Sequence, residues 1–169
     1  MPQRPLTLFA CSLLALSLSG ITAVHAADMP STTPEVFAPG TISGPAGVDC
    51  LTFAPDGATV YFDQQAGWNG FIMESHRVGS GWSTPRIAPF SGQWQDHDPA
   101  MAPDGSFLVY TSNRADVAGG SALRGGHLWR VDRRGDGWSE PVRLPDAVND
   151  APSIYAPSVA ANGDVYYQR

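Results

Sequence analysis

Two short patterns of turn residues return at intervals along the chain and divide it into repeats. Residues 53–57 read Phe-Ala-Pro-Asp-Gly, residues 101–105 read Met-Ala-Pro-Asp-Gly, and residues 159–163 read, more loosely, Val-Ala-Ala-Asn-Gly. A second pattern, Gly-Trp-Ser-x-Pro, occurs at 81–85 and returns 56 residues later at 137–141. Because both patterns return in the same order, the sequence predicts successive copies of one structural unit.

Runs of apolar and aromatic residues with a period of two flank these turns, which indicates β-hairpins. We expect each hairpin turn to be a two-residue turn with positive φ at its central positions. The strands expected directly after the turns cover 58–62, 106–110 and 164–167. The third strand is expected at 70–74 in the first unit and at 126–131 in the second. A Gly-rich turn then leads into an outer strand headed by Trp82 or Trp138. Each unit is therefore predicted to be a four-stranded antiparallel meander of about 50 residues.

A meander of this size cannot bury both of its faces alone, so the units should stack face to face as the blades of a propeller do. The predicted fold class is all-β, with two full blades and the start of a third at about 44–92, 93–148 and 149–169. Trp82 and Trp138 are expected to pack between blades. Since propellers typically have 4 to 8 blades, we expect either a fragment of a longer propeller or an assembly of several chains.

The first 26 residues have the pattern of an export signal. Arg4 supplies a positive charge, residues 6–18 are almost entirely apolar, and Val24-His25-Ala26 has the small residues of a cleavage site. No other stretch approaches the roughly 20 apolar residues of a membrane helix. We therefore expect a periplasmic or secreted protein with no membrane span after cleavage. The alternative is an uncleaved N-terminal anchor.

Residues 27–43 follow the export signal and are rich in Pro, Thr and Ser without a period. This composition predicts a flexible leader, with a first strand at Val36-Phe37. The rest of the mature chain, from residue 44 to residue 169, is assigned to the partial propeller.

The composition narrows the class of partner. The chain has 16 Asp and Glu against 10 Lys and Arg, a formal charge of -6, which disfavours nucleic acid as a ligand. Cys50 is the only cysteine outside the export signal, so no intrachain disulfide can form. We expect a buried, unreactive Cys50, because its neighbour Asp49 cannot lower the pKa of a thiol.

The second unit carries a longer pattern. Residues 98–105 read Asp-Pro-Ala-Met-Ala-Pro-Asp-Gly, residues 108–114 read Leu-Val-Tyr-Thr-Ser-Asn-Arg, and residues 127–129 read His-Leu-Trp. This resembles the TolB-type, WD-like β-propeller repeat, and the resemblance covers about 44–169. The first unit departs from the repeat with Asp-Gln-Gln at 63–65, where Ser-x-Arg is expected. Similar repeats occur in export-system accessory proteins, peptidoglycan-associated proteins and non-catalytic domains of serine peptidases, so the resemblance specifies a fold rather than an activity.

The most concentrated polar segment is Trp94 to Pro99, which in the resembling repeat leads into the innermost strand near the channel mouth. Alternation along a strand predicts Asp96 and Asp98 on one side and His97 on the other, an arrangement that disfavours joint metal coordination. We expect no catalytic residue, no metal site and no cofactor. The residues predicted to contact a ligand lie in loops at the same end of the blades: Asp49, Trp94, Asp96, His97, Asp98, Asn149 and Tyr155.

These features favour an exported binding or scaffolding module for a protein, a peptide or a glycan of the cell envelope. The sequence lacks Gly-x-Ser-x-Gly, His-Glu-x-x-His and phosphate-binding loops, so an enzyme is disfavoured. One alternative is the non-catalytic propeller domain of a peptidase or other hydrolase whose catalytic domain is absent from this chain. Another is a metal propeller of the sugar-lactone type, which requires acidic residues that converge on the central channel.

Overall fold

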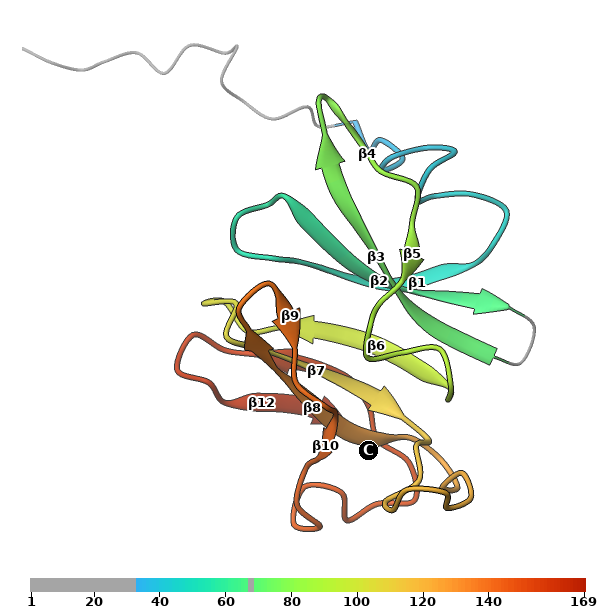
Figure 1. Ribbon diagram of the computed structural model, residues 1–169, viewed down its shortest axis with the longest axis vertical. Helices are drawn as coiled ribbons and strands as arrows, with labels where there is room; N and C mark the ends of the chain where they lie inside the picture. The colour runs from blue at the N-terminus through green and yellow to red at the C-terminus, as the bar shows by residue number, and fades with distance from the viewer. Residues whose placement is uncertain (1–32, 67–68) are drawn as a thin grey trace, which may run out of the picture. The chain divides into compact units, whose positions relative to one another are not determined.

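The computed structural model describes residues 33–66 and 69–169, and within these ranges every regular element is a β-strand (Figure 1). All pairs of named strands are antiparallel, so the predicted all-β class and the meander are confirmed. Over the described ranges there is no helix with the length and apolar character to cross a membrane. The predicted export signal, residues 1–26, and the first part of the leader lie outside the described residues.

The strands form two five-stranded sheets and one two-stranded sheet. Blade 1 consists of β1 (Val48–Phe53), β2 (Thr59–Ala66), β3 (Asn69–Val78), β4 (Gly81–Trp82) and β5 (Arg86–Ile87). Blade 2 consists of β6 (Asp96–Met101), β7 (Phe107–Ser112), β8 (His127–Arg134), β9 (Gly137–Trp138) and β10 (Val142–Arg143). Blade 3 consists of β11 (Tyr155–Val159) and β12 (Val165–Gln168).

The Pro-Asp-Gly turns of blades 1 and 2 and the Ala-Asn-Gly turn of blade 3 share one geometry. Only the glycine has positive φ: 64° at Gly57, 73° at Gly105 and 87° at Gly163. Each glycine N–H donates to the carbonyl three residues earlier. Asp56 Oδ1 accepts the N–H of Ala58 at 2.8 Å, and the corresponding Asp or Asn of the other turns does the same. The expected two-residue turn is therefore wrong, because one left-handed glycine closes a longer loop.

The Trp-Ser-x-Pro pattern divides the outer strand of each full blade into two short pieces. Ser83 Oγ accepts the N–H of His76 at 3.0 Å, and Ser139 Oγ accepts the N–H of Asp132 at 3.0 Å. The serine hydroxyl thus satisfies a strand N–H between the two pieces of the outer strand, where no outer-strand carbonyl pairs with it. As a result β4 and β5 both pair with β3, and β9 and β10 both pair with β8.

Blades 1 and 2 share one apolar core. Figure 1 shows their two sheets stacked one above the other. Tyr61 of β2 faces Trp138 of β9 with 5.8 Å between ring centroids, and Phe90 lies 5.6 Å from the same indole. Ile72 of β3 and Val131 of β8 are fully buried in this core. The prediction that Trp138 packs between blades is confirmed.

The other face of blade 1 is covered by the segment 35–43 rather than by a blade. Phe37 lies 5.6 Å from Trp82 and 5.5 Å from Phe53, and Ile42 is only 2% exposed. Trp82 therefore does not pack between two blades, in contrast to the expectation. This part of the predicted flexible leader is packed against the sheet.

The predicted strand at Val36-Phe37 is wrong. Prolines at positions 34 and 39 bracket it, and a proline cannot donate to a strand ladder. The chain turns instead, with the N–H groups of Thr41 and Ile42 directed to the carbonyl of Ala38.

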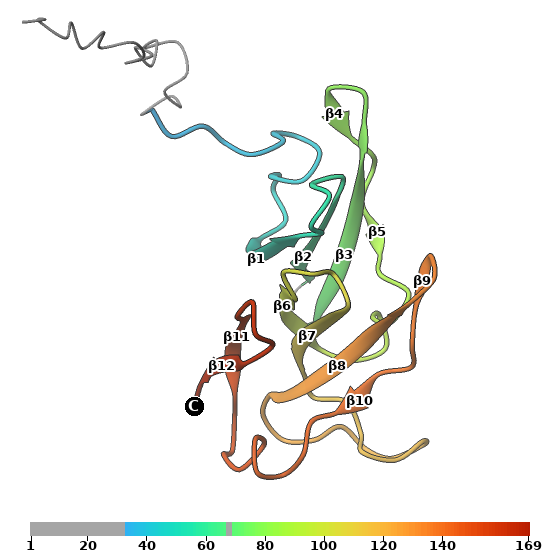
Figure 2. The same cartoon turned by 90° about the vertical axis from the view of Figure 1, so that its left-hand side faces the viewer.

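Blade 3 covers the opposite face of blade 2, and Figure 2 shows β11 and β12 beside β6 and β7. Val109 and Leu128 share a core with Ile154, against which Val165 and Tyr167 of β12 pack. Because both faces of blade 2 are covered, all six residues of β7 are buried.

Candidate functional site

The three innermost strands bring one equivalent position to the same cleft. Asp49 of β1, His97 of β6 and Tyr155 of β11 each precede the glycine of their own turn by eight residues. All three line a cleft of about 390 Å³. Three of the residues predicted to contact a ligand are thus brought together by the repeat itself.

The second strand of each full blade completes the wall of this cleft. Asp63 and Gln65 of β2 occupy the positions that Thr111 and Asn113 occupy in and after β7, 48 residues later. The cleft holds the carboxylates of Asp49, Asp63 and Asp98, and none of the described residues lining it is Lys or Arg. The remaining lining residues are small or polar: Gln95, Ser112, Gly125, Gly126 and Ser153.

A β-bulge at Asp98 sets which side chains face the cleft. The register shifts between His97 and Ala100, and Asp98 has a φ of 53° immediately before a proline. The bulge turns both His97 and Asp98 towards the cleft and leaves Asp96 outside it. The expectation that Asp96 and Asp98 share a side is therefore wrong, because regular alternation fails at a bulge. Ala156, the equivalent residue of blade 3, has a φ of 47°.

Asp96 instead joins two parts of the polypeptide in the interior. It is fully buried, and its two carboxylate oxygens accept hydrogen bonds of 2.6 Å from the hydroxyls of Ser91 and Ser112. Burial raises the pKa of Asp96, although both hydroxyl donors oppose the increase. Its contacts hold the β5–β6 connection against β7.

His97 reaches from blade 2 into blade 1. Its Nδ1 lies 3.1 Å from Gln65 Nε2 and 3.6 Å from Asp63 Oδ2. The ring packs so closely on Gly70 of β3 that a Cβ at that position would collide with it. Unprotonated Nδ1 accepts a hydrogen bond from the Gln65 amide, and protonated Nδ1 pairs with the Asp63 carboxylate.

The opposite charges of His97 and Asp63 shift the pKa values of both groups. The Asp63 carboxylate, 3.6 Å from Nδ1, raises the pKa of His97, and partial burial only weakens this effect. Burial alone would raise the pKa of Asp63, but the neighbouring His97 and the hydrogen bond from the N–H of Cys50, at 2.7 Å, together hold it below its ordinary value. His97 is therefore held as a cation over a wider pH range than a free histidine.

Asp98 links all three blades at the bulge position. Its Oδ2 accepts the N–H of Ala156 in blade 3 at 3.0 Å and the hydroxyl of Thr111 at 3.4 Å. Burial, and then the hydrogen bond with Asp98, raise the pKa of the Cys50 thiol to about 12. Cys50 is free and half-buried rather than buried as expected, and its thiol is poorly suited to act as a nucleophile.

Like Asp96, two further predicted residues, Asn149 and Trp94, lie outside the cleft. Asn149 is 7% exposed; its Oδ1 accepts the N–H of Leu128 at 2.8 Å, and its Nδ2 donates to the carbonyls of Leu128 and Leu144. It therefore connects the chain after β10 to β8. Trp94 is half-buried in the connection before β6 and lines a separate hollow.

The sequence reasoning missed Asp63, Gln65, Thr111 and Asn113. The 48-residue repeat places 64–66, not 63–65, at the position of the Ser-x-Arg of blade 2, so the mismatch at 63–65 was one residue out of register. Alternation along β2 puts Asp63 and Gln65 on one side of the strand, but it does not tell which side meets the cleft. Over the two described ranges, no group of three or more His, Cys, Asp or Glu side chains is placed to hold a metal ion.

No family model matches the sequence, and no curated protein matches it. Among solved structures, the chain is similar to TolB from Acinetobacter baumannii, with 20% sequence identity and a TM-score of 0.46 over 76% of this chain. The match spans 27% of the length of that TolB chain.

Proposed function

We propose that this chain is an exported β-propeller module that binds a protein or peptide, and that the cleft between the three blades receives a basic side chain of that partner. The observation that carries the proposal is the convergence of Asp49, His97 and Tyr155, which are equivalent positions of three blades, on one polar cleft. A site assembled from several blades at the ends of their inner strands suits recognition of a ligand larger than a single group.

The charge of the cleft favours a cationic ligand. Asp63 is paired with His97, and Asp98 accepts the N–H of Ala156. These two carboxylates therefore attract a cationic ligand mainly by long-range electrostatics rather than by direct contact. Asp49 is exposed at its wall, and Tyr155 is 50% exposed. A carboxylate beside an accessible aromatic ring can hold a Lys or Arg side chain by an ion pair and by a cation–π contact.

The proposed location outside the cytoplasm is supported by the sequence of residues 1–26. Residues 1–26 have the charge, the apolar run and the small-residue site of an export signal, which places the module outside the cytoplasm in this proposal. The Cys50 thiol, whose pKa is raised to about 12, is a poor nucleophile, so we propose binding rather than thiol catalysis for this module.

Calorimetric titration with pentalysine and with pentaglutamate tests the proposal. We expect pentalysine to bind, pentaglutamate not to bind, and the affinity for pentalysine to fall as salt is added. Asp49→Asn should weaken pentalysine binding by about three- to tenfold.

The matched control is Asp136→Asn, which removes one carboxylate that is also exposed but does not line the cleft. This variant should bind pentalysine as the unchanged protein does. Equal losses in the two variants would mean that only the net charge of -6 attracts the peptide, and the proposed site would then be wrong.

A further inference from the structure

His97 is a titratable cation in the wall of a cleft whose other charged groups are carboxylates. Among the described residues that line this cleft, Asp49, Asp63 and Asp98 supply negative charge, and His97 alone can supply positive charge. Histidine is the side chain that gains or loses its proton near neutral pH. Protonation of His97 therefore offsets one of three negative charges at the place where a basic side chain of the partner would bind.

The Nδ1 atom of His97 has a different partner in each protonation state. It lies 3.1 Å from Gln65 Nε2, a distance at which an unprotonated Nδ1 accepts the amide N–H. Asp63 Oδ2 is 3.6 Å away, just beyond hydrogen-bond distance. With a proton on Nδ1, the imidazolium is attracted to the carboxylate instead. Both partners lie on β2, so one imidazole reaches either of them from blade 2.

The Asp63 carboxylate is fixed in place, so the proton on His97 decides how strongly that carboxylate attracts a cation. The Asp63 side chain is 2% exposed, and its Oδ1 accepts the N–H of Cys50 at 2.7 Å. When His97 is protonated, the two opposite charges lie close together and largely cancel at a distance. When His97 is neutral, the charge of Asp63 is uncompensated. We propose that proton binding to His97 weakens the binding of a cationic ligand in this cleft, and that loss of the proton strengthens it.

The groups around His97 determine the pH at which its charge changes. The strands packed against β6 are β1, β2, β3, β7 and β11. Asp63 on β2 raises the pKa of His97, burial opposes this effect, and Asp98 and Asp96 on β6 itself raise the pKa further. The charge of His97 therefore changes at a pH above the usual 6.5. Further titratable groups in or beside the cleft are Asp49 and Cys50 of β1 and Tyr155 of β11, while β3 and β7 present Gly70 and Thr111.

This inference rests on the proposed function, because it requires a cationic ligand in the cleft. The interaction of two unit charges a few ångströms apart, in a site open to water, changes an affinity about three- to tenfold. Coupling between two sites is reciprocal, so the ligand must lower the proton affinity of His97 by the same factor by which the proton lowers the affinity for the ligand. The effect can therefore be measured both on the ligand and on the histidine.

Calorimetric titration of the full chain with N-acetylated pentalysine at several pH values tests the inference. Acetylation removes the α-amino group, which would titrate near pH 8, and the lysine side chains stay charged because their pKa is about 10.4. We expect the affinity to rise about three- to tenfold between about pH 5.5 and about pH 8.5. His97→Gln should remove this rise, because glutamine keeps a polar side chain but does not titrate.

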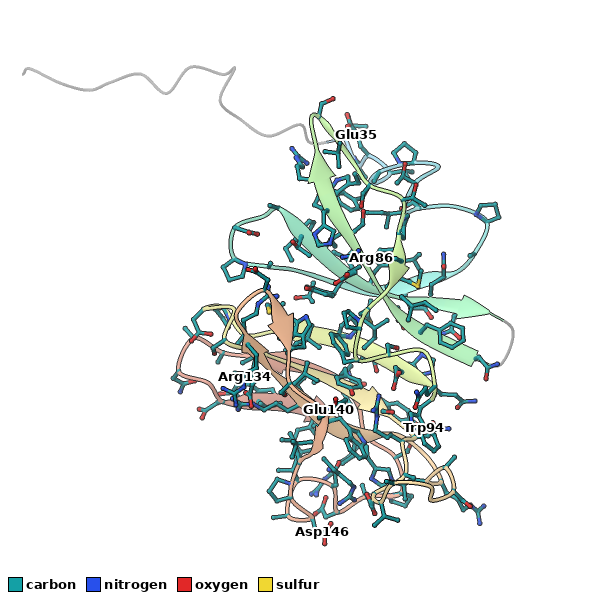
Figure 3. All side chains as sticks on the ribbon, viewed as in Figure 1. Glu35, Arg86, Trp94, Arg134, Glu140 and Asp146 are labelled. Carbon is teal, nitrogen blue, oxygen red and sulfur yellow. The ribbon has the colours of Figure 1, made fainter. Side chains whose placement is uncertain are left out.

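The matched control is His76→Gln, which removes a histidine outside the cleft. His76 Nε2 lies 3.4 Å from Nη2 of Arg86, which Figure 3 labels, and neither residue lines the cleft. This variant should keep the full dependence of pentalysine binding on pH. A loss of the dependence in both variants would mean that the general charge of the protein, and not His97, causes it.

NMR titration of the His97 imidazole in the unchanged protein gives a second measurement that needs no variant. A saturating concentration of the peptide should lower the pKa of His97 by about 0.5 to 1. The inference is overturned if the peptide binds equally well at all pH values, if His97→Gln shows the same rise, or if the peptide leaves the pKa of His97 unchanged. In these cases the proposed cleft still stands. If the peptide binds at no pH, the proposed function is wrong and the inference fails with it.

Discussion

At Gly70 the backbone of β3 lies so close to the His97 imidazole that no side chain fits between them. This single absence of a Cβ lets a histidine of blade 2 reach Asp63 and Gln65 of blade 1. Glycine here supplies space rather than backbone freedom, because its φ is not in the left-handed region. The cross-blade contact depends on this glycine as much as on the histidine itself.

Gly70→Ala should displace His97 from blade 1. We expect a loss of about 1–3 kcal/mol in the free energy of unfolding, since the new methyl group forces the ring to move. The pKa of His97, measured by NMR titration, should fall towards its ordinary value because the contact with Asp63 is lost. Gly44→Ala, where a Cβ meets no atom within 4 Å, is the control and should change neither quantity.

The raised pKa of His97 also predicts a dependence of stability on pH. In the folded state the pKa lies above the value of the unfolded chain, so the stabilisation is fully present below about pH 6.5 and is lost as the pH rises through the folded pKa. Because the imidazole is partly exposed, we expect a loss of only about 0.5–1 kcal/mol. Denaturant unfolding of the unchanged protein and of His97→Gln at several pH values measures it, and a parallel decline in both proteins would contradict the assignment to His97.

Among the elements, the outer strands show how a short sequence pattern becomes a structural device. The serine of each Trp-Ser-x-Pro satisfies a strand N–H at the place where the outer strand is interrupted, in blade 1 through Ser83 and in blade 2 through Ser139. The tryptophan before it packs into the neighbouring apolar core, and the proline after it ends the first piece of strand. The pattern repeats because each of its residues has a separate structural task.

Ser83→Ala and Ser139→Ala should each reduce the free energy of unfolding by about 1 kcal/mol, because each leaves the strand N–H without its acceptor. The two losses should add in the double variant, since the serines belong to different blades and share no partner. Chemical denaturation gives these values. Ser80→Ala, in an exposed turn, should be neutral, and an equal loss at Ser80 would contradict the role assigned to the two hydroxyls.

For the molecule as a whole, the blades are stabilised by their neighbours rather than singly. One core joins blade 1 to blade 2, and a second joins blade 2 to blade 3, while the segment 35–43 covers the remaining face of blade 1. Stability in such a stack is the sum of the blades and of the interfaces between them. A substitution at an interface should therefore destabilise both of the blades that the interface joins.

Trp138→Ala should destabilise blades 1 and 2 together, by about 2–3 kcal/mol, because the indole packs between Tyr61 and Phe90 and is only partly exposed. Hydrogen exchange should show a loss of protection in β2 as well as in β8. Loss confined to blade 2 would mean that the blades unfold independently. Trp82→Ala, whose indole meets the segment 35–43, should leave the protection of β8 unchanged.

The sequence allowed the strands and turns to be predicted because they depend on local pattern, as with the period of two around residues 53–57 and 101–105. It could not give the orientation of Asp98, since a bulge depends on pairing with β7. Asp49, His97 and Tyr155 were each predicted to contact a ligand, but their convergence required the stacking of three blades. Asp63 and Gln65 were missed because only the fold shows which face of β2 meets the cleft.

The segment 35–43 has a consequence for handling the protein. Phe37 packs edge-on against Phe53 and Trp82, and Ile42 is buried in the cluster against which Trp82 packs. Proteolytic nicking between residues 43 and 48 would release this segment and expose the apolar face of blade 1. Preparations clipped there would self-associate, even though every strand of the three blades had survived the cut.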